Sequence, residues 1–188
     1  MTTSVGRNSG STATPTKATF SYWLKGSHDG TQQGIWGWHR GNDASNFWLG
    51  VYYSTNGSMY FNWKQTSLSV TLGTTQKFRD PTAWAHHVIA IDTTQGTAAD
   101  RLVMFVNGVE QTYDNVDDVG SNFGILMDSS IDFRVGIYRT NGGNIRYMDG
   151  QYAHFHFINY EDGATPDPYT DFGETDATTG IWKPKTSP

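Results

Sequence analysis

Carboxylates are the residues with which this sequence could perform hydrolysis, and few of them are suitably spaced. Glycoside hydrolysis needs two carboxyl groups flanking one bond, about 5–5.5 Å apart for retention and about 6.5–9.5 Å apart for inversion. The three glutamates are Glu110, just after an Asn-Gly turn, and Glu161 and Glu174 near the C-terminal end. Asp117 and Asp118 are adjacent in a polar stretch and are expected to be solvated. Since G-x-S-x-G, a phosphate-cradling loop and H-E-x-x-H are also absent from the sequence, we predict no catalytic residues and no enzymatic activity.

Histidine pairs could bind a transition metal, and the sequence contains two such pairs. His154 and His156 are two residues apart in an alternating stretch, so on a strand they share a face. That spacing suits Zn²⁺ if a third ligand comes from elsewhere. No third ligand can be identified, and a surface pair is the expected arrangement. His86 and His87 are adjacent, so on a strand they point to opposite faces, with one of them buried and hydrogen-bonded. We predict no metal-binding residues.

Four aspartates in one acidic stretch offer oxygen ligands for Ca²⁺: Asp114, Asp117, Asp118 and Asp128. The segment DNVDDVG does not have the spacing of an EF-hand loop. A solvated acidic loop is therefore the preferred interpretation, Ca²⁺ is the alternative, and no other cofactor is expected.

The densest cluster of aromatic and polar side chains lies around one turn and comprises Trp36, Trp38, His39, Asp43 and Trp48. Exposed aromatic rings suit the apolar faces of sugars, and neighbouring polar side chains suit their hydroxyls. These five residues are therefore the predicted glycan-binding site. The alternative, weighed equally, is that Trp36 and Trp38 share the buried face of one strand and belong to the core.

The elements that must position these residues are predicted to be β-strands throughout. Apolar and polar residues alternate, and the alternating stretches are bounded by turn-forming residues. Asn107-Gly108, between Val106 and Val109, favours a type I′ hairpin because both central residues of that turn need φ > 0. No stretch has a convincing helical period of 3.6 residues. The predicted strands cover 18–25, 34–39, 47–53, 59–64, 67–72, 131–138 and 148–158, and the unit 84–114 reads as strand, loop, strand, tight turn and strand.

Composition restricts both the fold class and the partners. The chain has 188 residues, enough for one domain with a sizeable core. Aromatic residues make up 14%, which favours strands, and the absence of Cys rules out disulfides. The net charge is −5 and no basic patch stands out, so no nucleic acid is expected as a partner. No apolar run reaches the roughly 18 residues of a membrane span, so no membrane insertion is expected.

Two polar arms flank the predicted domain, which comprises residues 17–160. Residues 1–16 are mostly Ser, Thr, Gly and Asn, which predicts either a disordered tail or an arm that becomes ordered against a neighbouring subunit. Residues 161–188 are predicted to form an extended tail, packed on the domain or a neighbour and anchored by Tyr169, Phe172 and Trp182. Residues 1–16 also lack the apolar run of a secretory signal, which predicts synthesis in a cytoplasm.

Several motifs resemble the concanavalin A-like lectin/glucanase superfamily, and its laminin-G-like members in particular. They are FSYWLKGS (20–27), WAHHVIAIDTT (84–94), RLVMFVNGVEQ (101–111) and YMDGQYAHFHFINYED (147–162). The resemblance implies an all-β fold, a two-sheet antiparallel β-sandwich or jelly roll with extended N- and C-terminal arms. Enzymes of this superfamily carry E-x-D-x-E or E-x-D-x-x-E on one strand, and this chain lacks that motif.

The ending, from Asp149 to Lys185, is similar to the endings of lectin-like domains in virion proteins of tailed bacteriophages, including marine and cyanobacterial phages. The resemblance implies a non-enzymatic structural protein located in the virion. Capsid decoration, as a cement protein, is favoured over a tail or fibre role because the chain is short and lacks heptads and fibre repeats. Its partners would be other virion proteins and further copies of itself, by analogy in a trimer. A host-surface glycan is a further expected partner. The alternative is a carbohydrate-binding lectin module for host recognition.

Overall fold

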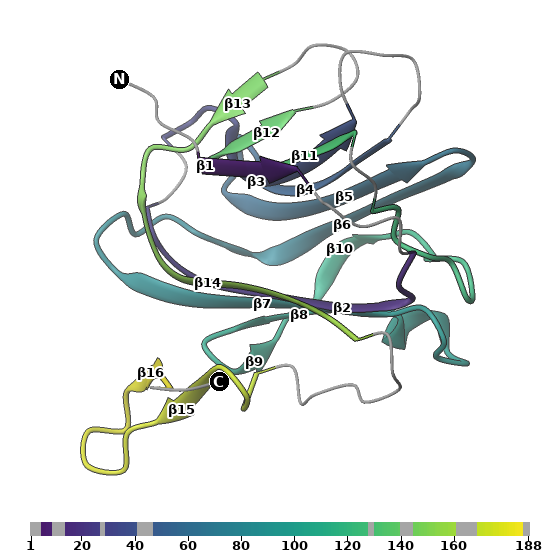
Figure 1. Ribbon diagram of the computed structural model, residues 1–188. Coiled ribbons are helices and arrows are strands. Elements are labelled where there is room, and N and C mark those ends of the chain that lie inside the picture. Colours follow the sequence, from purple (N-terminus) through teal and green to yellow (C-terminus); the bar gives the residue numbers. More distant parts are fainter. Residues whose placement is uncertain are drawn as a thin grey trace.

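Two large antiparallel sheets stack face to face and form the body of the protein, as the ribbon of the computed structural model shows (Figure 1). The structure describes residues 5–8, 14–26, 29–40, 47–127, 130–139, 145–160 and 169–185, and for 5–8 and 115–116 it describes the backbone. The predicted all-β, two-sheet sandwich is confirmed. Within the described ranges no helix is long and apolar enough to cross a membrane.

The first layer is a seven-stranded sheet in the order β1-β11-β3-β4-β5-β6-β10. The strands predicted over 47–53 and 59–64 form the antiparallel hairpin of β4 and β5, with Trp48 opposite Lys64 and Tyr52 opposite Tyr60. The strands are β1 (Val5–Asn8), β3 (Gln33–Arg40), β4 (Phe47–Tyr53), β5 (Ser58–Gln65), β6 (Leu68–Lys77), β10 (Tyr113–Val116) and β11 (Ile131–Val135).

The second layer is a five-stranded sheet in the order β14-β2-β7-β8-β9. Asn107 and Gly108 join β8 to β9 with φ angles of 50° and 77°, which confirms the predicted turn with two positive φ values. A short 3₁₀ turn, η1 (Ala98–Asp100), precedes β8. The strands are β2 (Lys17–Lys25), β7 (Trp84–Asp92), β8 (Leu102–Val106), β9 (Val109–Glu110) and β14 (Gln151–Asn159).

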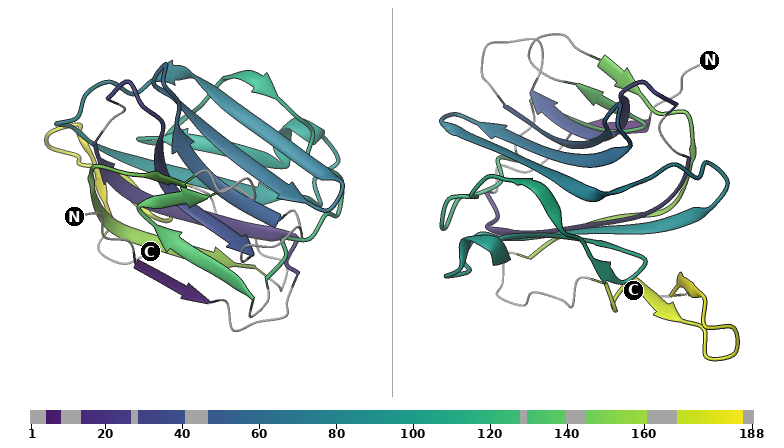
Figure 2. Two further views of the ribbon diagram at one scale, coloured as in Figure 1. Left: turned by 90° about the horizontal axis from the view of Figure 1, so that it is seen from above. Right: turned by 180° about the vertical axis from the view of Figure 1, so that it is seen from behind.

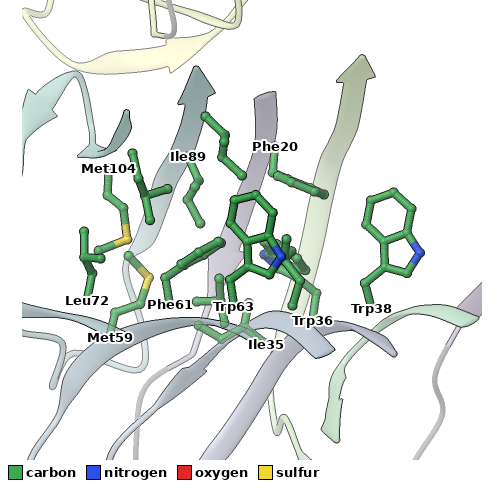
Figure 3. Packing of buried hydrophobic residues seen from close by; sticks show 14 of the residues in the cluster. Phe20, Ile35, Trp36, Trp38, Met59, Phe61, Trp63, Leu72, Ile89 and Met104 are labelled. Carbon is green, nitrogen blue, oxygen red and sulfur yellow. The ribbon is translucent and has the colours of Figure 1, made fainter. Parts of the chain in front are cut away.

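The core lies between the two layers and contains the residue sets that alternation assigned to single strand faces (Figure 3). Phe20 from β2 stacks on Trp36 from β3 with ring centroids 4.3 Å apart, so these rings join the layers directly. The other inward sets come from every long strand of both sheets, among them Tyr22, Leu24, Leu49, Val51, Met59, Phe61, Trp63, Leu72, Ile89 and Met104.

A hairpin covers part of the outer face of the seven-stranded sheet. Its strands, β12 (Ile137–Arg139) and β13 (Ile145–Tyr147), lie over β3 and β4 (Figures 1 and 2). Glycines permit this close approach. A Cβ at Gly34 would lie 2.2 Å from the Tyr138 backbone nitrogen, and a Cβ at Gly50 would lie 2.8 Å from the Tyr138 ring. The hairpin leaves the same face of β5 and β6 uncovered by the described residues.

Two predicted strands have different bounds in the structure. The strand predicted over 131–138 is broken at Gly136, whose φ is 81°, and its halves β11 and β12 belong to different sheets. The strand predicted to end at Leu72 continues to Lys77, because Gly73 and Thr74 keep a pairing partner in β10.

The last long strand contains a bulge that alternation did not predict. The register of β14 against β2 shifts between Ala153 and His156, and His154 has a φ of 48°. As a result Tyr152, not Ala153, packs with Phe155 and Phe157 against the core. Strict alternation along 148–158 would have placed Ala153 on that face, so alternation fails at this bulge.

Parts of both predicted arms pack on the domain itself. In the N-terminal arm, β1 pairs with β11 at the edge of the seven-stranded sheet. The C-terminal segment forms a small hairpin of β15 (Gly173–Thr175) and β16 (Trp182–Pro184) outside the five-stranded sheet (Figure 1). The three predicted anchors contact that sheet: Tyr169 packs on Phe105, Phe172 on His156, and Trp182 on His86.

Candidate functional site

Two of the predicted glycan-binding tryptophans are core residues. Trp36 is 0% exposed and Trp38 is 2% exposed. Both rings pack on Phe20 and Phe133 between the sheets (Figure 3). The sequence allowed two locations for these tryptophans, the core or a sugar-binding surface, and the structure places both in the core. Their rings offer no face to a ligand on this surface.

His39 lies at the bottom of a small pocket beneath the β12–β13 hairpin. The pocket has a volume of about 80 Å³ and is also lined by Arg134, Arg139 and Tyr147. It is far smaller than the roughly 300–1,000 Å³ of typical ligand sites, so it suits a few water molecules. Burial lowers the pKa of His39, and the nearby Arg139 acts in the same direction, so the imidazole is neutral at pH 7. The fourth predicted residue, Asp43, lies outside the described residues.

Trp48 is the predicted residue that the structure leaves on an open surface. It is half-buried on the outer face of β4, between His39 on β3 and Lys64 on β5. Its indole also hydrogen-bonds with Tyr138 of the covering hairpin. Burial raises the pKa of Tyr138, so this hydroxyl stays protonated and keeps the contact at all ordinary pH values.

Five outward residues of β4, β5 and β6 form what we call the sheet platform: Trp48, Tyr60, Asn62, Lys64 and Thr71. All five are half-buried. Among these five, the sequence predicted Trp48 alone as a site residue. The outward polar and aromatic positions of the strand 59–64 were the available signal for the rest of the platform.

The two ends of the platform are fixed by contacts of different kinds, ring stacking at Tyr60 and a hydrogen bond to Tyr138 at Trp48. At one end Tyr60 stacks on Tyr52 with centroids 5.5 Å apart, and its ring lies over Gly73, where a Cβ would approach it to 2.7 Å. The Arg146 guanidinium lies 4.6 Å from the centre of the Tyr52 ring. At the other end stands Trp48, four residues along β4 from Tyr52 and hence about 13 Å away at about 3.3 Å per residue. The rings are therefore held in position before any ligand arrives.

The amide of Asn62 lies between these aromatic ends. Its row contains Gly50 on β4 and Thr71 on β6, so the neighbouring position on β4 carries no side chain. Asn62 Nδ2 donates to Thr71 Oγ1 over 3.3 Å. Asn62 Oδ1 has no hydrogen-bond partner among the described residues, although it is shielded from solvent. This oxygen is an unpartnered acceptor, which a ligand hydroxyl can reach only once the Asn62 side chain turns outward from its contact with Thr71.

The described aspartates considered as Ca²⁺ ligands each bind a different group of the protein. Asp114 pairs with Lys77 at 3.5 Å, and Asp118 pairs with Arg101 at 3.0 Å. Asp117 accepts a hydrogen bond from the Thr71 amide. Asp128 lies outside the described residues. Across the described ranges, no three His, Cys, Asp or Glu residues come together in a metal-binding group.

The two histidine pairs are arranged as the strand alternation predicted. His154 and His156 share a face, with ring centroids 6.4 Å apart. His86 and His87 point to opposite faces of the five-stranded sheet and both are fully buried. His86 is hydrogen-bonded to Ser21 Oγ at 2.8 Å and to Trp182 Nε1 at 3.0 Å.

No protein-family model and no curated protein sequence matches the chain, whereas solved structures with a similar fold are numerous. One is a heptameric SAP-like pentraxin from Limulus polyphemus (TM-score 0.55, 14% identity, covering 81% of this chain and 68% of the pentraxin). Another is the CBM40 domain of a Ruminococcus gnavus sialidase bound to α2,3-sialyllactose (TM-score 0.58, 14% identity, 82% and 80% covered). A third is the LG4-5 segment of the mouse laminin α1 chain (TM-score 0.59, 10% identity, 83% and 39% covered). At these identities the similarities establish the jelly-roll fold.

Proposed function

We propose that this chain is a non-catalytic carbohydrate-binding protein whose ligand lies on the sheet platform. The observation that carries the proposal is the outward polar row of Asn62 between two half-buried aromatic ends, Trp48 and Tyr60. Aromatic rings stack on the apolar faces of sugars, and an amide with Lys64 beside it can bind their hydroxyls. The similarity in fold to a domain solved with sialyllactose supports this choice of ligand class.

The absence of catalysis is part of the proposal and is supported by the positions of the candidate groups. Glu110 lies opposite Phe105 at the edge of the five-stranded sheet, and Glu174 pairs with Lys183 at 3.4 Å in the C-terminal hairpin. Glu174 is therefore held by a lysine and not by a second carboxylate. The third glutamate, Glu161, lies outside the described residues.

The Ser21–His86 pair does not form an activated nucleophile. The Trp182 indole can only donate, so His86 Nδ1 must accept its hydrogen bond. In the neutral ring Nε2 then carries the proton and donates to Ser21 Oγ. An Nε2 atom that is already protonated cannot take the hydroxyl proton of the serine, which general-base activation requires.

We propose further that this module belongs to a phage virion, made in the host cytoplasm and assembled with neighbouring virion subunits or further copies of itself. Support comes from the sequence resemblance of the C-terminal stretch and from the placement of the arms. The described parts of both arms lie at the edge of one sheet and outside the other, so the sheet platform remains open toward a host surface. Labelling the protein in purified particles tests this setting, and particles that lack it would exclude the proposal.

Binding is tested by screening the folded protein against a glycan array and measuring the best ligand by calorimetry. Trp48→Ala and Asn62→Leu should each weaken binding by about 5-fold, since a stacked ring or a hydrogen bond contributes about 1 kcal/mol. Tyr147→Ala is the matched control, because Tyr147 is exposed on β13 outside the platform. Unchanged affinity in both platform variants, with their melting temperatures preserved, would rule out the platform as the site.

A further inference from the structure

A second surface, which we call the end groove, lies at one end of the sandwich. It has a volume of about 510 Å³, within the range of roughly 300–1,000 Å³ that is typical of ligand sites. Segments far apart in the sequence form it: the end of β2, the start of β3, the loop between β6 and β7, and the turn before β14. The lining residues are Lys25, Gly26, Asp29, Gln33, Arg79, Pro81, Asp149, Gly150 and Gln151.

The floor of the end groove is fixed by hydrogen bonds. Gln33 is almost fully buried, and its Oε1 accepts the Asp149 backbone amide at 3.1 Å. The same side chain hydrogen-bonds to the Asp29 carboxylate, which Thr31 also holds through its amide and its hydroxyl. Hydrogen bonds from Thr31 and Gln33 lower the pKa of Asp29 to about 2, so this group is an acceptor only.

The end groove has no excess of positive charge. Lys25 and Arg79 contribute two cations to its wall, and Asp29 and Asp149 contribute two carboxylates. A third carboxylate, Asp80, lies near Lys25. These carboxylates disfavour phosphate and other strongly anionic ligands, because they would repel them. An apolar ligand is also disfavoured, because nearly all the lining side chains are polar.

An exposed indole stands beside the end groove. Trp84 is 41% exposed, the largest exposed fraction among the seven tryptophans. It is the cross-strand neighbour of Lys25, whose other neighbour is Gln151. The row Gln151–Lys25–Trp84 therefore crosses three adjacent strands at spacings of about 4.8 Å, with its first two members in the groove wall. A ring of five or six atoms placed in the groove can rest on this indole.

We propose that the end groove, with Trp84 as its stacking surface, binds an uncharged saccharide as a subsite separate from the sheet platform. Hydroxyl groups can both donate and accept, so they match a wall that presents ammonium, guanidinium, amide and carboxylate groups together. The proposal shares the ligand class of the proposed function and so rests on it. The two sites lie on different parts of the sandwich and can be tested separately.

The test follows the indole N–H signals of the ¹⁵N-labelled full chain by NMR. The protein is titrated with maltopentaose, cellopentaose, xylopentaose and laminaripentaose, and with inorganic phosphate as the anionic comparison. At least one oligosaccharide should shift the Trp84 signal, and phosphate should not. Trp84→Ala and Gln151→Ala should weaken that binding by 10-fold or more. Ile181→Ala, at an exposed apolar residue that does not line the groove, should leave it unchanged.

The outcomes separate the two proposals. A Trp84 signal that no uncharged oligosaccharide moves, or that only phosphate moves, overturns the end groove as a saccharide site. If Trp48 responds while Trp84 does not, the sheet platform stands and the end groove fails. If Trp84 responds while Trp48 does not, the end groove stands and the platform fails. Retention of the other indole signals in each variant shows that the variant is folded.

Discussion

Lowering the pH from 7.5 to 5 should destabilise the fold, because two fully buried histidines must remain neutral in it. His87 stacks on Tyr22 with centroids 5.3 Å apart, and neither of its ring nitrogens has a hydrogen-bond partner among the described residues. Burial, and secondarily the neighbouring His86, lowers the pKa of His87 to about 3. Burial, followed by His156 and His154, lowers the pKa of His86 to about 4.

The sign and size of the effect follow from linkage. Below pH 6.5 the unfolded chain binds a proton at each histidine, whereas the folded chain does not until the pH approaches 4 for His86 and 3 for His87. Stability is therefore highest above pH 6.5 and falls as the pH decreases through this window. Each histidine contributes a loss of about 2 kcal/mol at pH 5. The loss grows by at most about 1.4 kcal/mol per further unit and levels off near pH 4 for His86 and pH 3 for His87. A combined loss of about 4 kcal/mol is large against the roughly 5–15 kcal/mol that stabilises a typical domain.

Urea unfolding at pH 7.5, 6.5 and 5 measures the free energy of unfolding directly. His87→Phe keeps the ring stacked on Tyr22 and removes the titrating group, so it should reduce the loss at pH 5 by about 2 kcal/mol. His154→Asn is the comparison variant, because His154 is exposed and Asn accepts its positive φ. His154 is the smallest of the three causes that lower the pKa of His86, so this variant should keep most of the loss at pH 5. The reasoning fails if stability is flat between pH 7.5 and 5, or if His87→Phe loses as much as the parent protein.

Two further substitutions test how the outer elements are held. Gly50→Ala would place a Cβ 2.5 Å from the Trp36 carbonyl oxygen and 2.8 Å from the Tyr138 ring. It should therefore lower the melting temperature and reduce the free energy of unfolding by about 1–3 kcal/mol. An unchanged melting temperature would contradict the close approach of the β12–β13 hairpin. Trp182→Ala removes the hydrogen bond to His86. The backbone amides of β15 and β16 should then lose protection in hydrogen exchange, while those of β2 and β7 keep theirs. Unaltered exchange would show that other contacts hold the hairpin.

The sequence by itself determined most of the strands, the main hairpin and the fold class. Successive side chains on a strand alternate between two faces, so Phe20, Tyr22 and Leu24 could be assigned to one face without any tertiary information. The Asn107-Gly108 turn is equally local, because the φ values it needs depend on the residue types alone. Local rules of this kind are satisfied within a few residues, and they gave correct predictions here.

The tertiary structure alone decided which faces are covered and which residues meet. Alternation groups Trp36 with Trp38, but only the second sheet packing above them makes that face the core, while Trp48 stays on the outside. The end groove joins residues from Lys25 to Gln151, which no sequence spacing connects. The bulge at His154 likewise depends on pairing with β2. Burial and proximity are set by how sheets stack and strands pair over long sequence distances, so they become visible only once the chain has folded.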